Sequence, residues 1–272
     1  MSDSSSSDFS ANVERFTGFA DVYAHFRPTV PAIIVDILTQ LAHTPHPALV
    51  VDIGSGTGLS TRLWTDHAER VIGVEPSDDM RTQAEVQSTE SPNVSYRSGL
   101  SSATGLPDNC ADIVTISQAL HWMEPVSTFA EVARILRPGG IFAAIDNDWP
   151  PTIDLEAESL DHAFDDHADA IMAQHSFDRD VKRWQKQEHF ARIATSGHFR
   201  HVKEIAVHSV EPGSADRMVG LTLSQGTIQT LLKNGISAEA LGVPLYRAEM
   251  HHILGDGDRP MYFTYRVRLG IK

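Results

Sequence analysis

The feature that most constrains the fold is a glycine-rich loop directly after a short apolar run. Residues 48–53 read ALVVDI and are followed by GSGTGLS, which places glycine at positions 54, 56 and 58. Glycine lets the backbone turn sharply and lets a ligand approach the backbone amides without a Cβ in the way. We therefore expect a buried strand that ends in a ligand-binding loop and continues into a helix.

Short β-branched runs alternate with longer amphipathic runs from residue 48 to residue 146. The expected strands cover residues 48–53, 70–75, 93–98, 111–117 and 141–146. Most are continuous apolar runs, as in strands buried on both faces. Ser77 and Pro125 mark helix starts, and RPGG at 137–140 is a strong stop before the fifth strand. The pattern predicts βαβ units around a parallel sheet.

The segments on either side of this core have a different character. Residues 1–11 are rich in Ser and Asp and predict a disordered tail, with order beginning near Asn12. Apolar spacing then predicts two helices, one through Phe16, Ala20 and Tyr23 and one over 33–41. Beyond residue 146 we expect helices near 160–171 and 181–193, a strand at 202–210, short helices between 218 and 245, and an alternating strand at 261–269.

Charge and cysteine content exclude several classes of protein. The 272 residues carry 22 Lys and Arg against 36 Asp and Glu, a formal charge of −14, which disfavours nucleic acid and anionic membranes as partners. Cys110 is the only cysteine, so neither an internal disulfide nor a Cys-based zinc site is expected within one chain. No apolar stretch approaches the roughly 18 residues of a membrane span, and the first residues do not resemble a signal peptide. These properties predict a cytoplasmic protein.

An acidic residue at the end of the second strand narrows the ligand. Glu75 lies 17 residues beyond Gly58, where a carboxylate accepts both hydroxyls of a ribose. A dinucleotide fingerprint requires G-x-G-x-x-G or G-x-G-x-x-A, but Leu59 occupies the last position. NAD is therefore the weaker candidate, and a purely structural glycine turn is the alternative without a ligand.

Five motifs together resemble the class I S-adenosylmethionine-dependent methyltransferases. They are DIGSGTG at 52–58, VEPS at 74–77 with Met80 following, LPDNCAD at 106–112, SQALHW at 117–122, and LRPGG at 136–140. The lead-in YAHFRPTVP at 23–31 is similar to that of small-molecule members of this group. The resemblance covers residues 12–148 and implies a doubly wound, mostly parallel seven-stranded sheet of Rossmann-like type, with helical insertions after the fifth and sixth strands.

The resemblance also implies roles for individual residues. Asp52, Gly54 and Gly56 would surround the methionine part of S-adenosylmethionine, and Glu75 would bind the ribose hydroxyls. Met80 would lie against adenine, and Gln118 would face the sulfonium end. Ser55, Gly58 and Pro76 are further expected cofactor-binding residues, and Arg27 is a candidate to pair the cofactor carboxylate. Many members place an acidic residue near the adenine amino group, where this chain has Ser101 and Ser102.

Acceptor contacts are expected just beyond the fourth and fifth strands. His121 is the candidate general base, since its unperturbed pKa near 6.5 suits proton removal at neutral pH, and the alternative is that His121 and Trp122 only wall the pocket. Asp146 and Trp149 would touch the acceptor, while Asp148 is as readily a turn or helix cap. Tyr23 would reach over the cofactor or simply pack against the sheet.

Two polar clusters have a simpler interpretation than a functional site. The segment 158–175 carries His162, Asp166 and Asp169 on one helical face, but a solvated helix surface explains them, and no metal is expected. A basic cluster, Arg179, Lys182, Arg183 and Lys186, is likewise interpreted as a solvated helix face, with a local contact to nucleic acid as the alternative.

These observations predict an enzyme that moves a methyl group from S-adenosylmethionine to an O, N or C nucleophile of a small molecule, leaving S-adenosylhomocysteine. The expected domain spans 12–272, with a cofactor-binding core at 12–148, a helical lid and acceptor region at about 149–200 and 212–258, and closing strands at about 202–210 and 261–269. A nicotinamide-dependent reductase and a non-catalytic cofactor-binding regulator are the alternatives. The sequence does not determine the oligomeric state or the acceptor.

Overall fold

The computed structural model describes Asn12 and residues 26–272. Its core is a single seven-stranded sheet with strand order β3-β2-β1-β4-β5-β7-β6. The strands are β1 (Val50–Ile53), β2 (Val71–Val74), β3 (Val94–Arg97), β4 (Ala111–Ser117), β5 (Leu136–Asn147), β6 (His201–Gly213) and β7 (Arg259–Ile271). The first five strands pair in parallel, whereas β7 is antiparallel to both β5 and β6. The predicted α/β fold with a mostly parallel seven-stranded sheet is confirmed.

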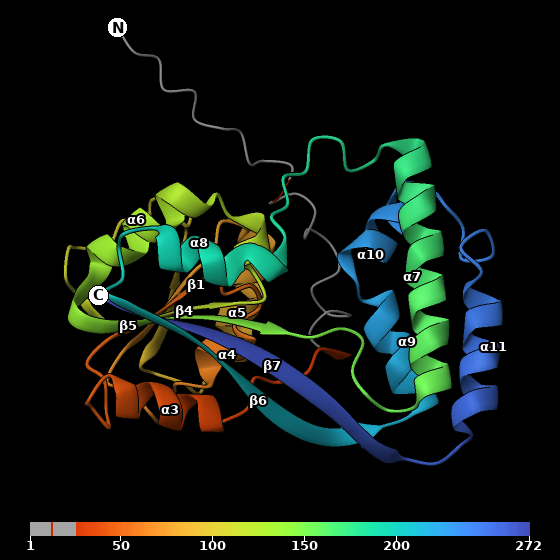
Figure 1. Ribbon diagram of the computed structural model, residues 1–272, viewed down its shortest axis with the longest axis horizontal. Coiled ribbons are helices and arrows are strands. Elements are labelled where there is room, and N and C mark those ends of the chain that lie inside the picture. The colour runs from red at the N-terminus through yellow and green to blue at the C-terminus, as the bar shows by residue number, and fades with distance from the viewer. Residues whose placement is uncertain (1–11, 13–25) are drawn as a thin grey trace, which may run out of the picture.

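Helices cover both faces of the sheet (Figure 1). The described helices of the sheet region are α3 (Ile33–Leu41), α4 (Leu59–Arg62), α5 (Asp78–Gln87), α6 (Pro125–Ile135) and α8 (His189–Thr195), with the 3-10 turns η1 (Leu120–Trp122) and η2 (Lys186–Glu188). Leu38 of α3 belongs to one buried cluster, and Phe129 of α6 and Ile193 of α8 belong to the other. Each face of the sheet therefore has its own apolar core.

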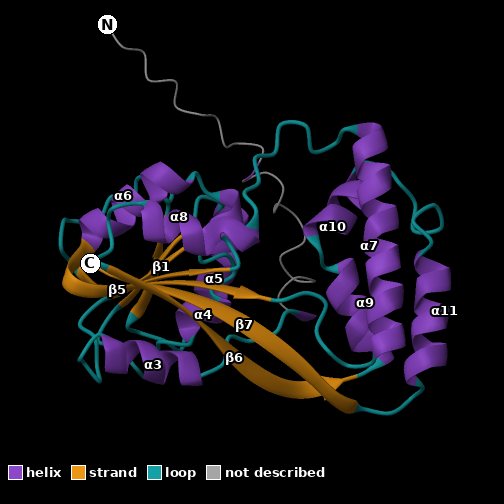
Figure 2. Cartoon of the chain, viewed as in Figure 1, coloured by secondary structure: helices purple, strands orange, loops and turns teal. Residues whose placement is uncertain are grey.

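A second group of helices stands beside the sheet rather than on it (Figure 2). It consists of α7 (Leu155–His175), which follows β5, and of α9 (Ala215–Leu223), α10 (Gly226–Lys233) and α11 (Val243–Leu254), which lie between β6 and β7. The hairpin of β6 and β7 pairs from 201 to 213, but β5 accompanies β7 only over 265–271, so the hairpin extends past the sheet to these helices. Both predicted helical insertions are present. No described helix is long and apolar enough to cross a membrane.

Start and stop positions follow local chemistry. The Ser77 hydroxyl caps α5 by accepting from the Met80 amide, and Glu124 caps α6 with Pro125 at its first position. The prediction that the fifth strand begins at 141 is wrong, because β5 starts at Leu136 and the RPGG segment lies within it. An irregularity in the β4–β5 pairing between Ala111 and Ile113 accommodates these residues.

The expected helix at 181–193 is also wrong in its first half. Residues 176–185 form no helix, and within the expected range only η2 and the start of α8 are helical. Here the Trp184 amide donates to the His121 carbonyl at 2.9 Å, a tertiary contact that replaces a helical hydrogen bond. The expected helix through Phe16, Ala20 and Tyr23, and the tail at 1–11, lie outside the described residues.

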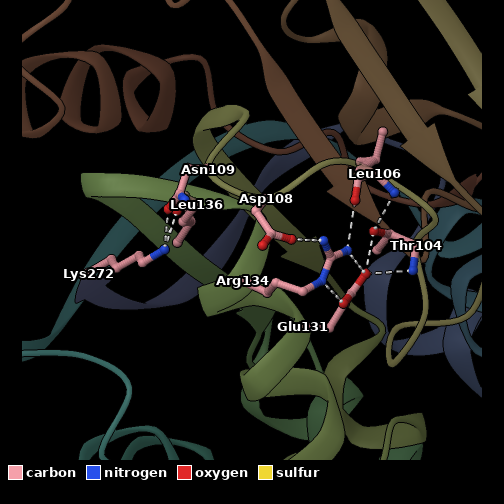
Figure 3. A network of polar contacts seen from close by, with 8 residues as sticks. All are labelled: Thr104, Leu106, Asp108, Asn109, Glu131, Arg134, Leu136 and Lys272. Atoms are coloured by element: carbon pink, nitrogen blue, oxygen red, sulfur yellow. Dashed lines mark hydrogen bonds and ion pairs between the residues drawn. The ribbon is translucent and has the colours of Figure 1, made fainter.

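A polar network fastens the loop after β3 to α6 (Figure 3). Glu131 accepts from the Thr104 amide at 2.7 Å and from Arg134 Nε at 2.7 Å, and Arg134 also donates to the Leu106 carbonyl at 2.8 Å. Burial alone would raise the pKa of Glu131, but Arg134 and Thr104 hold it below its usual value. The network therefore holds an ionised carboxylate that positions the loop at residues 98–106.

Candidate functional site

The loop after β1 is built for close approach to its backbone. Gly54, Gly56 and Gly58 have φ of +71°, +53° and +80°, in the left-handed region that favours glycine. A Cβ on Gly58 would lie 2.2 Å from the Tyr96 hydroxyl, whereas a Cβ on Gly56 would meet no protein atom within 4 Å. The loop thus packs tightly behind Gly58 and is open at Gly56.

Asp52 anchors this loop from beneath. Its carboxylate accepts from the hydroxyls of Ser60 and Thr61 at 2.7 Å and of Thr115 at 2.8 Å. Burial raises the pKa of Asp52, and these three hydroxyls oppose the rise. Asp52 lines none of the cavities described below, and neither does Gly58. Both residues therefore lie outside the lining of these three cavities.

Glu75, at the end of β2, faces the open side of the loop. One carboxylate oxygen accepts from the Gly56 amide and the other from the Ser77 amide, each at 3.0 Å. The residue is 8% exposed, and burial raises its pKa although both amides oppose the rise. Its orientation is thus fixed by the backbone before any ligand arrives.

Beside Glu75 is a cavity of about 150 Å³ at the carboxyl ends of β1, β2 and β4. It brings together most of the expected cofactor-binding residues, which are Gly54, Gly56, Glu75, Pro76, Met80, Ser101, Ser102 and Gln118. Met80 is 3% exposed on α5, and the Ser101 hydroxyl lies 2.8 Å from that of Thr128. We call this the nucleoside cavity. It lies where the strand order reverses around β1, the usual ligand position in an open α/β sheet.

A smaller cavity of about 70 Å³ lies on the other side of the glycine loop. Arg27, Ser55 and Gly56 line it, and Gln118 joins it to the nucleoside cavity. Within the described residues, the Ser55 and Thr57 hydroxyls and Gln118 Nε2 are buried without a hydrogen-bond partner. Buried polar atoms are rarely left unpaired, so these three fit a polar ligand such as the amino-acid part of S-adenosylmethionine.

The third and largest cavity, about 710 Å³, lies between the sheet and α7. We call it the acceptor cavity. His121, Trp122, Asp146 and Trp149 line it as expected, and Gln118 is shared with the two smaller cavities. The His121 and Trp122 rings lie 4.6 Å apart, and the Arg183 guanidinium lies 5.4 Å from the Trp122 ring centre. Asp148 also lines it and is ion-paired with Arg266 at 2.8 Å.

Asp146 is the centre of a charge network on the floor of the acceptor cavity. Its Oδ2 accepts from Arg268 at 2.7 Å, and its Oδ1 lies 3.4 Å from Lys186 Nζ and 3.9 Å from His121 Nδ1. Asp146 is 2% exposed, so this carboxylate is stabilised by its cationic neighbours rather than by water. The network places a carboxylate beside the expected base.

Lys186 is a site residue that the sequence analysis assigned to a solvated helix face. It lies in η2, lines the acceptor cavity, and donates to Gln118 Oε1 at 3.2 Å. Burial lowers the pKa of its ammonium, which the Asp146 carboxylate opposes. Only the tertiary fold brings Lys186 to Asp146, so the local pattern contained no indication of this position.

Asn12 is a second residue whose position the sequence did not indicate. Its side-chain amide donates to the carbonyls of Trp122 and Lys182, and it accepts from the Lys182 amide at 3.0 Å. It also lines the nucleoside cavity. Tyr23 lies outside the described residues, and no group of three or more metal-ligating side chains occurs in the part of the chain that the structure describes.

The central segment of the chain is similar to known methyltransferases. A methyltransferase domain family matches residues 51–144. An uncharacterised methyltransferase of Mycobacterium tuberculosis is 33% identical over 125 residues, 46% of this chain and 49% of that protein. A candidate methyltransferase of Dictyostelium discoideum is 31% identical over 127 residues, 47% of this chain and 46% of that protein. The chain thus matches about half the length of these curated relatives.

Solved structures extend the likeness to the whole fold. A candidate type II methyltransferase from Anaeromyxobacter dehalogenans has a TM-score of 0.66 at 21% identity and covers 90% of this chain and 98% of its own. A Haemonchus contortus phosphoethanolamine N-methyltransferase, solved with S-adenosylhomocysteine, has a TM-score of 0.56 at 15% identity over 97% of this chain and 60% of its own. Residues 51–144 therefore match a methyltransferase domain family, and the chain as a whole shares the fold of these solved methyltransferases.

Proposed function

We propose that this chain transfers a methyl group from S-adenosylmethionine to a small-molecule acceptor with an O, N or C nucleophile by in-line displacement. The observation that carries the proposal is the position of Gln118, which lines the nucleoside cavity, the small cavity beside Arg27 and the acceptor cavity. A cofactor in the first two and an acceptor in the third would meet at this residue.

The cofactor would be held by groups that already point into its cavities. Glu75 would accept the ribose hydroxyls, and Met80 with Ser101 and Ser102 would surround the adenine. Arg27, beside Ser55 in the small cavity, would pair the cofactor carboxylate. S-adenosylhomocysteine bound to the Haemonchus contortus protein is in line with this arrangement.

S-adenosylmethionine supplies a methyl group on a positively charged sulfur, so the protein itself needs to contribute little covalent chemistry. Alignment of the nucleophile with the methyl–sulfur bond can contribute roughly 7–11 kcal/mol to the lowering of the barrier. Among the described residues, Gln118 and the charged residues around Asp146 on the floor of the acceptor cavity are suited to align the acceptor. The region at about 149–200 and 212–258 would act as a lid that excludes water.

A proton must leave when the acceptor arrives as an alcohol or an ammonium. His121 is the proposed base, because it lines the acceptor cavity and its Nδ1 lies 3.9 Å from the Asp146 carboxylate. A positioned base of this kind adds typically ~10²- to 10⁴-fold to the rate. If the acceptor needs no deprotonation, His121 and Trp122 serve as the wall of the cavity.

Titration calorimetry with S-adenosylhomocysteine tests the proposal directly. We expect saturable binding to the wild-type chain, no binding of NADH, and an affinity loss of about tenfold or more in Glu75→Gln, since hydrogen bonds to a charged group contribute ~1.5–3 kcal/mol. Glu69→Gln is the matched control, because Glu69 is exposed just before β2. The absence of binding to the wild-type chain, or equal affinities of the two variants, would contradict the proposed cofactor site.

A further inference from the structure

Lys186 reaches the junction of the three cavities from a segment without regular structure. Residues 176–185 run from the end of α7 to η2 without forming a helix (Figure 1). The Trp184 amide donates to the His121 carbonyl at 2.9 Å, and the Asn12 side chain bridges the same two segments through its own hydrogen bonds. These contacts fasten η2, which begins at Lys186, to the turn that follows β4.

The Lys186 ammonium contacts side chains from two neighbouring strands. Its Nζ donates to Oε1 of Gln118, which follows β4, at 3.2 Å and lies 3.4 Å from Oδ1 of Asp146 on β5. An ammonium group only donates hydrogen bonds, so it binds the oxygen of the Gln118 amide and not the NH₂ group. The contact therefore decides which end of this amide points away from Lys186.

The other end of the Gln118 amide is available to a ligand. Nε2 is buried and has no hydrogen-bond partner within the described residues, and Gln118 lines all three cavities. Buried donors are rarely left unpaired, so an oxygen of a bound ligand fits this position. Rotation of the amide by half a turn would exchange its two ends and place an oxygen against that ligand oxygen, which is repulsive.

The position is unfavourable for an ammonium group taken alone. Burial is the main cause that lowers the pKa of Lys186, and the charges of Arg183 and Arg27 lower it further, whereas Asp146 opposes these effects. Ionisable groups with displaced pKa values concentrate at functional sites. The environment of Lys186 is thus in line with a role at the site rather than with a solvated helix face.

We propose that Lys186 is a positioning residue that holds the Gln118 amide with its NH₂ group toward the carboxylate of the bound cofactor. This inference rests on the proposed function and deepens it, because it gives the Gln118 contact a direction. The cofactor carboxylate is the ligand group concerned, since we place it in the small cavity beside Arg27, which Gln118 also lines. Lys186 acts through Gln118 and needs no contact of its own with the ligand.

A double-mutant cycle measured by titration calorimetry with S-adenosylhomocysteine tests this role. The four chains are wild type, Lys186→Met, Gln118→Ala and the double variant. Lys186→Met keeps an unbranched side chain but removes the donor, so affinity should fall about threefold to tenfold in the wild-type background. The same substitution should leave the affinity of the Gln118→Ala chain unchanged, because the amide through which Lys186 acts is then absent.

A matched ligand and a matched variant separate positioning from a general change of the site. 5′-Methylthioadenosine keeps the nucleoside and the sulfur but lacks the carboxylate, so Lys186→Met should not alter its affinity. Lys203→Met removes a lysine that is exposed on β6 and lines none of the three cavities, and it should alter neither affinity. Any effect of the lost cation on Asp146 is present in both Gln118 backgrounds and cancels in the cycle.

Gln118→Glu tests the direction of the amide without changing Lys186. It keeps the oxygen that Lys186 binds and replaces the NH₂ group by a second oxygen. We expect the affinity for S-adenosylhomocysteine to fall about tenfold or more, below that of Gln118→Ala, because two carboxylates then face each other. The affinity for 5′-methylthioadenosine should stay at the wild-type value.

The outcomes that contradict this role are distinct from a failure of the proposed function. Equal losses from Lys186→Met in the two Gln118 backgrounds, equal losses for the two ligands, or wild-type affinity of Gln118→Glu for S-adenosylhomocysteine would each overturn the positioning role. If the wild-type chain did not bind S-adenosylhomocysteine at all, the proposed function itself would fail. Urea denaturation of each variant checks folding, and Arg268 still pairs with Asp146 at 2.7 Å when Lys186 is replaced.

Discussion

At the residue scale, Gln118 combines an unfavourable backbone with a central position. Its φ is +54°, in the left-handed region that non-glycine residues rarely adopt, and this conformation costs about 1 kcal/mol or more. The Gln118 amide donates to the Ile145 carbonyl at 2.8 Å, and its side chain accepts from Lys186. These contacts hold the strained residue where the three cavities meet, the position at which we propose that its side chain contacts the ligand.

Two substitutions at Gln118 separate strain from binding. Gln118→Gly should be more stable than Gln118→Ala by about 1 kcal/mol, because only glycine relieves the left-handed backbone. Both variants lose the same side-chain amide and should bind S-adenosylhomocysteine with similarly reduced affinity. Urea denaturation and titration calorimetry measure the two effects. A side chain that only fills space would leave the affinities of both variants at the wild-type value.

Local chemistry made some site residues predictable and left others hidden. Glu75 was predictable because a carboxylate at the end of the second parallel strand necessarily lies beside the loop of the first. Lys186 was not, because its neighbours Arg179, Lys182 and Arg183 suggested a solvated basic face, and its approach to Asp146 depends on the irregular segment before η2. Burial of a charged residue by a distant loop leaves no trace in local periodicity.

At the scale of elements, strands were easier to predict than the segments between them. β1 and β4 are buried along nearly their whole length, so continuous apolar runs marked them, and the predicted ends agree with the structure within two residues. The start of β5 was missed because Pro138 and Gly139 lie inside a strand at an irregular pairing. The sequence thus predicted the sheet well, but not the course of residues 176–188 over the acceptor cavity.

The loop after β3 depends on Glu131 of α6, which holds it from behind (Figure 3). Glu131→Gln should lower the free energy of unfolding by about 2 kcal/mol, because hydrogen bonds from Thr104 and Arg134 to a charged acceptor are lost. Affinity for S-adenosylhomocysteine should fall as well, since this loop carries Ser101 and Ser102. Asp108→Asn is the control: Asp108 pairs with the same arginine but is largely exposed, so its loss should cost under about 0.5 kcal/mol.

At the scale of the whole molecule, two ionisable groups on different elements have opposite effects on the pH dependence of stability. Burial and Asp161 raise the pKa of Asp165 to about 6, so the folded chain binds more protons there than the unfolded chain, and this group lowers stability as pH rises from about 4 to about 6. Burial lowers the pKa of His189 in α8 to about 4, although Asp146 opposes the change. The unfolded chain therefore binds more protons at His189, and this group lowers stability as pH falls from about 6.5 to about 4.

Because the two effects have opposite signs over the same pH range, each should hide the other in the wild-type chain. Asp165→Asn should make the free energy of unfolding rise more steeply with pH between about 4 and 6. His189→Leu should make it rise less steeply or fall. After solvent screening, each substitution should change the free energy of unfolding by about 1–2 kcal/mol across this range. Urea denaturation at several pH values measures these slopes. Each variant is compared with wild type, so that the contributions of the other carboxylates to the free energy of unfolding cancel in the difference. Parallel curves for wild type and both variants would show that neither group changes its proton affinity on folding.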